Sequence, residues 1–326
     1  QERLSQQGTV DPIAFELYLR GRHLFNRGDL EGFRKSLELF QQALEQDPDL
    51  AAAHAGLSGA YFVHGFFRLA PASEMIPMAR AAAERALELD PSQEAAHATL
   101  GAIALYFDWD WETARRKIEL ALELNPTDVM THHGYADYLA VMGDCEGSVE
   151  HVLEARRHDP LGVWANLFVV GHLTGCRYYE RAVQEGQRAV ELGIEAPILQ
   201  EFVGRALWYQ GHYDQALTVW RETYGDDSPL VRVLQQGYDE GGPEGAMRAR
   251  AEALAASPTP RTDPLDIATH FAAAGEDDLA FEWLDRALEQ RIPQVLHIVI
   301  NPYFDSIRDD PRYGELLDRI GIPQPN

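Results

Sequence analysis

Four segments of this chain share one ending: Ala43-Leu-Glu-Gln-Asp-Pro48, Ala86-Leu-Glu-Leu-Asp-Pro91, Ala121-Leu-Glu-Leu-Asn-Pro126 and Ala155-Arg-Arg-His-Asp-Pro160. Their prolines are 43, 35 and 34 residues apart. A period near 34 is the length of one pair of helices with its turns. Because proline disfavours the helical conformation of the residue before it, each segment predicts the end of a helix. We therefore expect repeated helical hairpins.

Each period contains two helical patterns. In residues 111–124 the apolar positions fall three or four residues apart, on one helix face: Trp111, Ala114, Ile118 and Ala121. Residues 95–107 show the same spacing: Ala96, Leu100, Ala104 and Phe107. The small Gly101 at the centre of this second pattern predicts a close approach of the neighbouring helix.

These patterns predict an all-α fold, an α-solenoid in which helix-turn-helix repeats stack into a right-handed superhelix. The insertion behind the 43-residue period is expected at 65–77, an interruption at Gly241-Gly242-Pro243 and a linker at 257–264. We expect four parts along the chain: the start of the array at 1–12, about six regular repeats over 13–225, degenerate and C-terminal repeats over 226–291, and a capping helical tail over 292–326.

The small and aromatic positions recur from unit to unit: Leu57, Tyr61, Ala79 and Ala86; Leu100, Gly101, Ala104, Ala114 and Ala121; Tyr135, Ala136, Leu139, Ser148 and Ala155. This set resembles the tetratricopeptide repeat (TPR) over nearly the whole chain, from about residue 11 to residue 323. The resemblance implies stacked helix pairs whose first helices line a concave groove that binds a peptide or another protein.

A narrower resemblance rests on the stretches 14–21, 106–111 and 301–313. They are similar to the C-terminal repeat region of bacterial signalling proteins, where the repeats follow a winged-helix domain, a nucleotide cyclase or a Ser/Thr kinase. This implies a sensory or regulatory module of a larger protein. None of those three domains is recognisable in this sequence, so the class of output domain stays open.

Positions on the first helices predict the groove by analogy with the family. We expect it to be lined by Phe62, Ala98, Ala102, Leu105, Tyr106, Met130, His133, Asp137, Trp164, Leu167, Glu201, Arg205, Trp208 and Tyr209. Aromatic residues and arginine dominate the energetics of protein interfaces. The alternative for Leu105 and Trp164 is packing between repeats. A carboxylate clamp is not expected, because the corresponding pairs lack its lysine and asparagine: Ala55 and Gly59, Ala98 and Ala102, His133 and Asp137, Leu167 and Gly171.

Catalytic, metal and cofactor chemistry are not expected. The sequence contains no Gly-x-Ser-x-Gly, His-Glu-x-x-His or phosphate-binding Gly-x-x-x-x-Gly-Lys motif. His54, His97 and His132 recur in register but are expected to pack against the partner helix. His133 and Asp137 lie one helical turn apart and offer two metal ligands, which is too few for a zinc site without a third.

The charge balance restricts the partners. The chain has 52 acidic and 28 basic residues, a formal net charge of −24. Nucleic acids and anionic membranes are therefore not expected as direct partners. A ligand with an apolar or aromatic anchor, and a basic group facing Asp137 and Glu201, suits the groove better. No apolar run approaches the ~20 residues that span a bilayer and no secretory signal opens the sequence, so we expect a cytoplasmic location.

Cys145 and Cys176 are the two cysteines of the chain. A disulfide-stabilised scaffold needs many more, so we expect both as free thiols rather than as a bridge.

The sequence thus predicts a non-catalytic scaffold that binds a peptide or protein segment and regulates an attached domain. The first alternative is self-association into homodimers through the terminal helices, which an exposed apolar run at 295–300 would favour. The second is a small-ligand sensor, which would require a closed pocket.

Overall fold

The computed structural model of the chain describes residues 11–194, 196–256 and 263–322. Every regular element in these ranges is a helix, as the all-α prediction requires. The chain divides into an N-terminal unit, residues 1–127, and a C-terminal unit, residues 128–326. Most of the expected start of the array and most of the expected linker at 257–264 lie outside the described residues.

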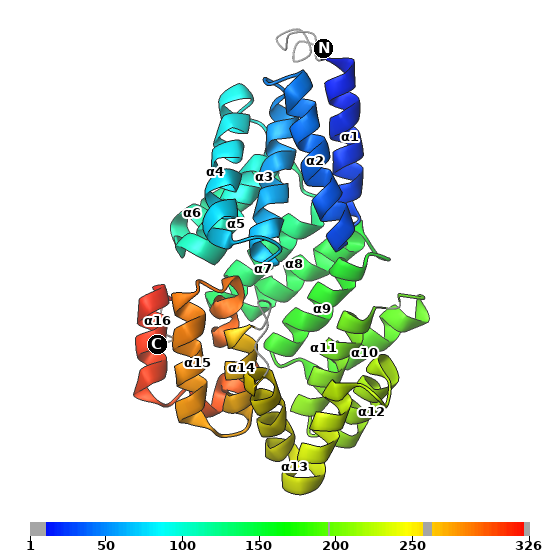
Figure 1. The fold of residues 1–326 in the computed structure, drawn as a ribbon, viewed down its shortest axis with the longest axis vertical. Coiled ribbons are helices and arrows are strands. Elements are labelled where there is room, and N and C mark those ends of the chain that lie inside the picture. Colours follow the sequence, from blue (N-terminus) through cyan, green and yellow to red (C-terminus); the bar gives the residue numbers. More distant parts are fainter. Residues whose placement is uncertain (1–10, 195, 257–262, 323–326) are drawn as a thin grey trace. The chain divides into compact units, whose positions relative to one another are not determined.

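In the N-terminal unit, successive helices pack as hairpins (Figure 1): α1 (Pro12–Asn26) with α2 (Leu30–Gln46), α3 (Ala51–Phe66) with α4 (Ala72–Leu89), and α5 (Glu94–Ile103) with α6 (Trp111–Leu124). A π-helical turn, η2 (Ala104–Asp108), extends α5. The residues inserted at 65–77 lengthen the second hairpin, since α4 has 18 residues and α6, the corresponding helix of the third hairpin, has 14.

The C-terminal unit continues the same pattern: α7 (Val129–Val141) with α8 (Cys145–His158), α9 (Val163–Gly175) with α10 (Tyr179–Glu191), α11 (Pro197–Tyr209) with α12 (Tyr213–Tyr224), and α14 (Pro264–Ala273) with α15 (Asp277–Glu289). Between α12 and α14, the helix α13 (Pro229–Ala256) is bent at Gly241 and Gly242, as the glycine pair predicted. Two short 3-10 helices, η3 (Pro293–Val299) and η4 (Pro302–Ile307), precede α16 (Pro311–Ile320).

Proline and aspartate set the helix boundaries. Asp47, Asp90, Asn125 and Asp159 are the C-terminal caps of α2, α4, α6 and α8, each directly before its proline, as the repeated ending predicts. Aspartates also begin several helices. Asp128, for example, accepts a hydrogen bond of 2.7 Å from the backbone N–H of Thr131. An N-terminal cap of this kind stabilises a helix by about 1 kcal/mol.

Small residues let the paired helices approach closely. Alanines at the repeated positions are fully buried, among them Ala86, Ala114 and Ala121. At Gly101, a Cβ atom would lie only 2.7 Å from Cγ1 of Ile118 in α6. The close approach predicted from Gly101 is thus present.

The cysteines correct the sequence analysis. Cys145 and Cys176 form a disulfide, with their Cα atoms 5.6 Å apart, instead of two free thiols. Cys145 begins α8, and Cys176 is the C-terminal cap of α9. Consecutive helices of the array pack together, so the start of one meets the end of the next. Cysteine number alone could not show this meeting.

The apolar run at 295–300 is mostly interior. Val295, Leu296 and Ile298 are fully buried, and Val299 and Ile300 are only partly exposed, so the exposed apolar run that would favour self-association is not present. Among the helices of the described ranges, none combines the length and apolar character needed to cross a bilayer.

Candidate functional site

The segment 293–307, which contains η3 and η4, packs against the first helices of the C-terminal unit. Tyr209, the last residue of α11, donates a hydrogen bond of 3.1 Å to the side chain of Asn301. Its ring lies 4.5 Å from that of Tyr303, centroid to centroid. We call residues 293–307 the C-terminal segment. It thus contacts a side chain that the sequence analysis assigned to the groove.

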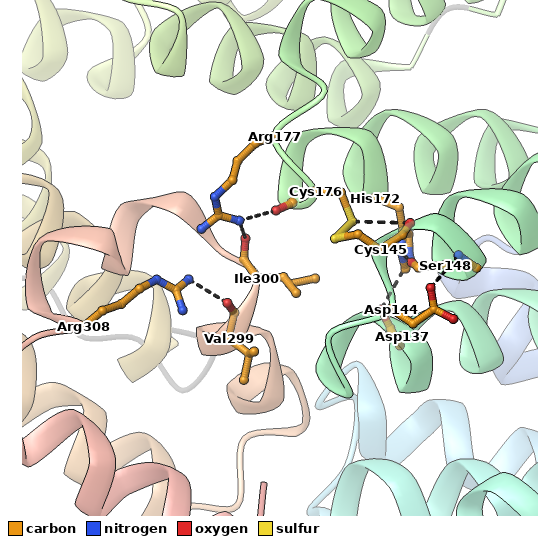
Figure 2. The surroundings of a disulfide bond; sticks show 12 residues. Asp137, Asp144, Cys145, Ser148, His172, Cys176, Arg177, Val299, Ile300 and Arg308 are labelled. Carbon is orange, nitrogen blue, oxygen red and sulfur yellow. Dashed lines mark hydrogen bonds and ion pairs between the residues drawn. A yellow bond between two sulfur atoms is a disulfide. The ribbon is translucent and has the colours of Figure 1, made fainter. Parts of the chain in front are cut away.

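Arg177 holds the same segment by its backbone (Figure 2). Its guanidinium donates to the carbonyl oxygen of Ile300 at 3.2 Å. The same guanidinium pairs with Asp305 at 2.6 Å. Arg177 has a left-handed backbone conformation, φ 64°, which is uncommon for a residue with a side chain. It directly follows Cys176, so the disulfide fixes the turn from which Arg177 reaches the segment.

A buried carboxylate lies at the centre of a histidine cluster. Asp137 of α7 is 2% exposed, and its Oδ1 lies 3.0 Å from Nε2 of His297 in η3. Oδ1 also lies 3.4 Å from Nε2 of His172 in α9. Oδ2 lies 3.7 Å from Nε2 of His133, one turn earlier on α7. The basic group expected opposite Asp137 is thus supplied by the chain itself, as His297.

The electrostatics of this cluster follow from burial. Burial would raise the pKa of the Asp137 carboxyl, but the charge and hydrogen bond of His297, with His133, outweigh it and hold the pKa well below its usual range. Burial lowers the pKa of His172 to about 3 and also lowers that of His133. For His297 the attraction of Asp137 outweighs burial, so its pKa is raised. Near neutral pH, His133 and His172 are therefore neutral imidazoles.

A second polar cluster surrounds α14. The Arg250 side chain donates to Nε2 of His270 at 3.0 Å, and Nδ1 of His270 lies 2.6 Å from the carbonyl oxygen of Asp266. The ring of His270 lies 5.9 Å from that of Tyr303 in the C-terminal segment. A neutral ring with its proton on Nδ1 satisfies both hydrogen bonds. A ring that is also protonated on Nε2 would direct an N–H group at the N–H group of Arg250. Burial accordingly lowers the pKa of His270 to about 4.

His270 predicts an acid-sensitive fold. Its pKa falls from 6.5 to about 4 on folding, so the unfolded chain binds more protons between these values. The free energy of unfolding is therefore highest above pH 6.5, where His270 is neutral in both states. It falls by about 3 kcal/mol as the pH decreases towards 4. The variant His270→Gln keeps a neutral donor and acceptor, and its unfolding free energy should fall less steeply over this range. Urea unfolding of both proteins from pH 7 to pH 4 measures the difference, and equal slopes would contradict it.

The N-terminal unit carries an aromatic pair on its first helices. Phe62 and Phe66 lie one turn apart on α3, with ring centroids 5.5 Å apart, and both stay partly exposed. Tyr106, in the π-helical turn that follows α5, contacts both rings. Its ring centroid lies 6.3 Å from that of Phe62 and 5.0 Å from that of Phe66. The small side chains Ala98 and Ala102 on α5 are also partly exposed. Phe62, Phe66, Ala98 and Ala102 form what we call the aromatic face.

The other predicted groove residues are distributed between surface and interior. Met130 is exposed, and His133, Trp164, Glu201, Arg205 and Tyr209 are partly exposed. Glu201 is paired with Arg205 at 3.2 Å. Four side chains are buried and are not available to a ligand in this conformation: Leu105, Tyr106, Leu167 and Trp208. Leu167 and Trp208 belong to the core of the C-terminal unit. The alternative of packing between repeats suits the buried Leu105 and stays open for Trp164, which is partly exposed but packs against the core of the C-terminal unit.

Three residues of these sites were not predicted from the sequence. Phe66 lies one turn after the predicted Phe62, and helical spacing could have indicated it. His172 follows Gly171, which was considered only for a carboxylate clamp. His297 lies outside the repeats, so no register could assign it to Asp137. No signal in the sequence joins these two residues.

The fold can be compared with solved structures. No protein-family model matches the chain. A human IFIT1 dimer with m7Gppp-AAAA matches with a TM-score of 0.59 and 14% sequence identity, over 88% of this chain and 74% of that one. IFIT1 is built of tetratricopeptide repeats. This chain has the tetratricopeptide-repeat fold.

Two further comparisons accompany this TPR assignment. A thermophilic TPR protein of Thermus thermophilus, TTC0263, matches with a TM-score of 0.47 and 16% identity, over 63% of this chain and 99% of that one. In sequence, 112 residues of this TPR chain are 30% identical to "Putative adenylate cyclase 3" of Rhizobium meliloti (strain 1021). The match covers 33% of this chain and spans 18% of the length of that relative.

Proposed function

We propose that this chain is a protein-interaction module of a larger regulatory protein and that a partner polypeptide binds its aromatic face. The observation that carries the proposal is the C-terminal segment. In the C-terminal unit, first helices of the array already hold a stretch of polypeptide that forms only 3-10 turns. The same kind of helix surface in the N-terminal unit is the aromatic face.

The contacts of the C-terminal segment support this proposal. Arg177 contacts a main-chain carbonyl, Tyr209 contacts an asparagine side chain and a tyrosine ring, and Asp137 contacts a histidine. Peptide-binding domains commonly combine main-chain hydrogen bonds with side-chain pockets in this way. We expect a partner of the aromatic face to use the same combination.

The aromatic face fits an apolar side chain. Phe62 and Phe66 are partly exposed and pack on the ring of Tyr106, and Ala98 and Ala102 on α5 are small and partly exposed. A π-helical turn often occurs where a helix presents side chains for function, and here it places Tyr106. Because the chain has a net charge of −24, we propose a partner segment with one apolar or aromatic anchor and basic flanking residues, and no direct binding of nucleic acid or membrane.

A regulatory context rests on two likenesses. One is the similarity to the adenylate cyclase relative over 112 residues, and the other is the resemblance to the repeat region of bacterial signalling proteins. We propose that the repeats act without catalysis on an output domain elsewhere in the protein. A cytoplasmic location stays a prediction, and the disulfide between Cys145 and Cys176 is unusual for that compartment. Self-association is the less supported alternative, because three residues of the apolar run that would favour it, 295, 296 and 298, are buried.

A random-peptide phage library selected on the purified chain tests the proposal. We expect enriched peptides with an aromatic or aliphatic anchor beside basic residues. Phe66→Ala should weaken the Kd of a synthetic selected peptide at least tenfold, because truncating a central aromatic anchor costs about 2 kcal/mol or more. Met78→Ala, an exposed position on the second helix α4, is the control and should leave the Kd unchanged. Failure to enrich any peptide, or equal Kd values for wild type and Phe66→Ala, would refute the proposed binding face.

A further inference from the structure

The cluster around Asp137 has the composition of a metal site. His133, Asp137 and His172 each offer one ligand atom, and these three atoms all lie within 4.8 Å of one another. Two imidazoles and one carboxylate form a ligand set that divalent transition-metal ions accept. The sequence indicated His133 and Asp137 as two possible ligands but no third. The packing of α9 against α7 supplies it as His172.

The distances suit coordination better than hydrogen bonding. His172 Nε2 lies 3.4 Å from Oδ1 of Asp137, and His133 Nε2 lies 3.7 Å from Oδ2. Hydrogen bonds between nitrogen and oxygen are usually about 2.7–3.2 Å long. In a tetrahedral zinc site with bonds of about 2.0–2.1 Å, neighbouring ligand atoms lie about 3.3–3.4 Å apart. With one ligand atom taken from each residue, the three atoms lie within 4.8 Å of one another, so side-chain movements of about 1 Å would bring them to coordination distance.

Each candidate ligand is oriented by an outer partner. Nδ1 of His172 lies 2.7 Å from the hydroxyl oxygen of Ser148 (Figure 2). This oxygen can accept a hydrogen bond from Nδ1–H, which leaves the lone pair on Nε2 free to bind an ion. His133 stacks on the ring of Phe168, with centroids 3.6 Å apart. His297 holds Asp137 at 3.0 Å. Metal ligands in proteins are commonly fixed by outer partners of this kind.

From this geometry we propose that His133, Asp137 and His172 bind one divalent transition-metal ion, of which Zn²⁺ is the representative. His297 is the outer hydrogen-bond partner of the ligating carboxylate. Because His297 belongs to η3, the ion would join α7, α9 and the C-terminal segment at one point. None of these residues belongs to the aromatic face, so a test of the metal site does not depend on the proposed function.

Zinc titration of the full, tag-free chain tests the proposal. The protein is treated with EDTA, dialysed and titrated with Zn²⁺ by isothermal calorimetry. We expect one ion per chain. His172→Gln and His133→Gln should each weaken binding at least 100-fold, and His297→Gln should weaken it about 10–100-fold, the usual effect of losing an outer partner.

A second histidine pair provides the matched control. Nδ1 of His132 lies 3.0 Å from Nδ1 of His151, so this pair could also attract Zn²⁺. His151→Gln should leave binding at the proposed site unchanged. Circular dichroism checks that each variant is folded, and if His172→Gln unfolds, the more exposed His133→Gln decides. No zinc binding by the wild type, or binding lost in His151→Gln and kept in His133→Gln, would overturn the proposal.

Discussion

Replacing Trp208 by alanine is expected to lower the free energy of unfolding by about 3–5 kcal/mol, the usual cost of truncating a buried tryptophan. Trp208 is 5% exposed, and its ring lies 4.8 Å from that of Tyr213 and 5.6 Å from that of Trp220. The deletion would leave a cavity between α11 and α12. For a unit of this size, the melting temperature should fall by roughly 10 °C.

Met130→Ala is the control for this prediction. Met130 was also assigned to the groove, but it is 47% exposed, so its truncation should change the unfolding free energy by less than about 0.5 kcal/mol. Urea unfolding of the three proteins measures both effects. If Trp208→Ala were as stable as the wild type, the placement of Trp208 in the core would be wrong.

Asp137→Ala is expected to destabilise the C-terminal segment most strongly. The substitution removes the carboxylate that faces His133, His172 and His297 and leaves His297 without its 3.0 Å hydrogen-bond partner. Removing one partner of a buried ion pair costs about 3–5 kcal/mol. Hydrogen exchange followed by mass spectrometry, with EDTA present to exclude metal effects, should show faster exchange of the amides in 293–300.

The control for Asp137→Ala removes one partner of a surface ion pair, Arg286 and Glu282. Both side chains are about half exposed, and such pairs contribute little to stability. Glu282→Ala should therefore leave exchange in 293–300 unchanged. Slow exchange of 293–300 in Asp137→Ala would mean that Asp137 does not hold the segment.

The sequence predicted the helical hairpins because their determinants are local. The Asp-Pro and Asn-Pro pairs stop helices at Asp47, Asp90, Asn125 and Asp159 through steric effects between neighbouring residues. Glycine at position 101 likewise predicted the close approach of α5 and α6 that the structure contains. Features that depend on residues within one or two turns could thus be derived without coordinates.

The sites could be predicted only in part because they depend on distant contacts. His297 meets Asp137 across 160 residues of sequence, and Tyr209 meets Asn301 across 92. Register in the repeats placed Asp137 and Tyr209 on first helices but could not show that the chain's own C-terminal segment contacts them. Cys145 and Cys176 were missed for a similar reason, since their pairing follows from how α8 and α9 pack.

Photo-crosslinking tests the central claim most directly. The photoreactive residue p-benzoylphenylalanine replaces either Ala102, on the aromatic face, or Tyr209, which contacts the C-terminal segment. With a selected peptide present, the residue at 102 should crosslink to the peptide, and the residue at 209 should crosslink within the chain to residues 301–303. Crosslinking of the peptide at 209 and not at 102 would contradict the account.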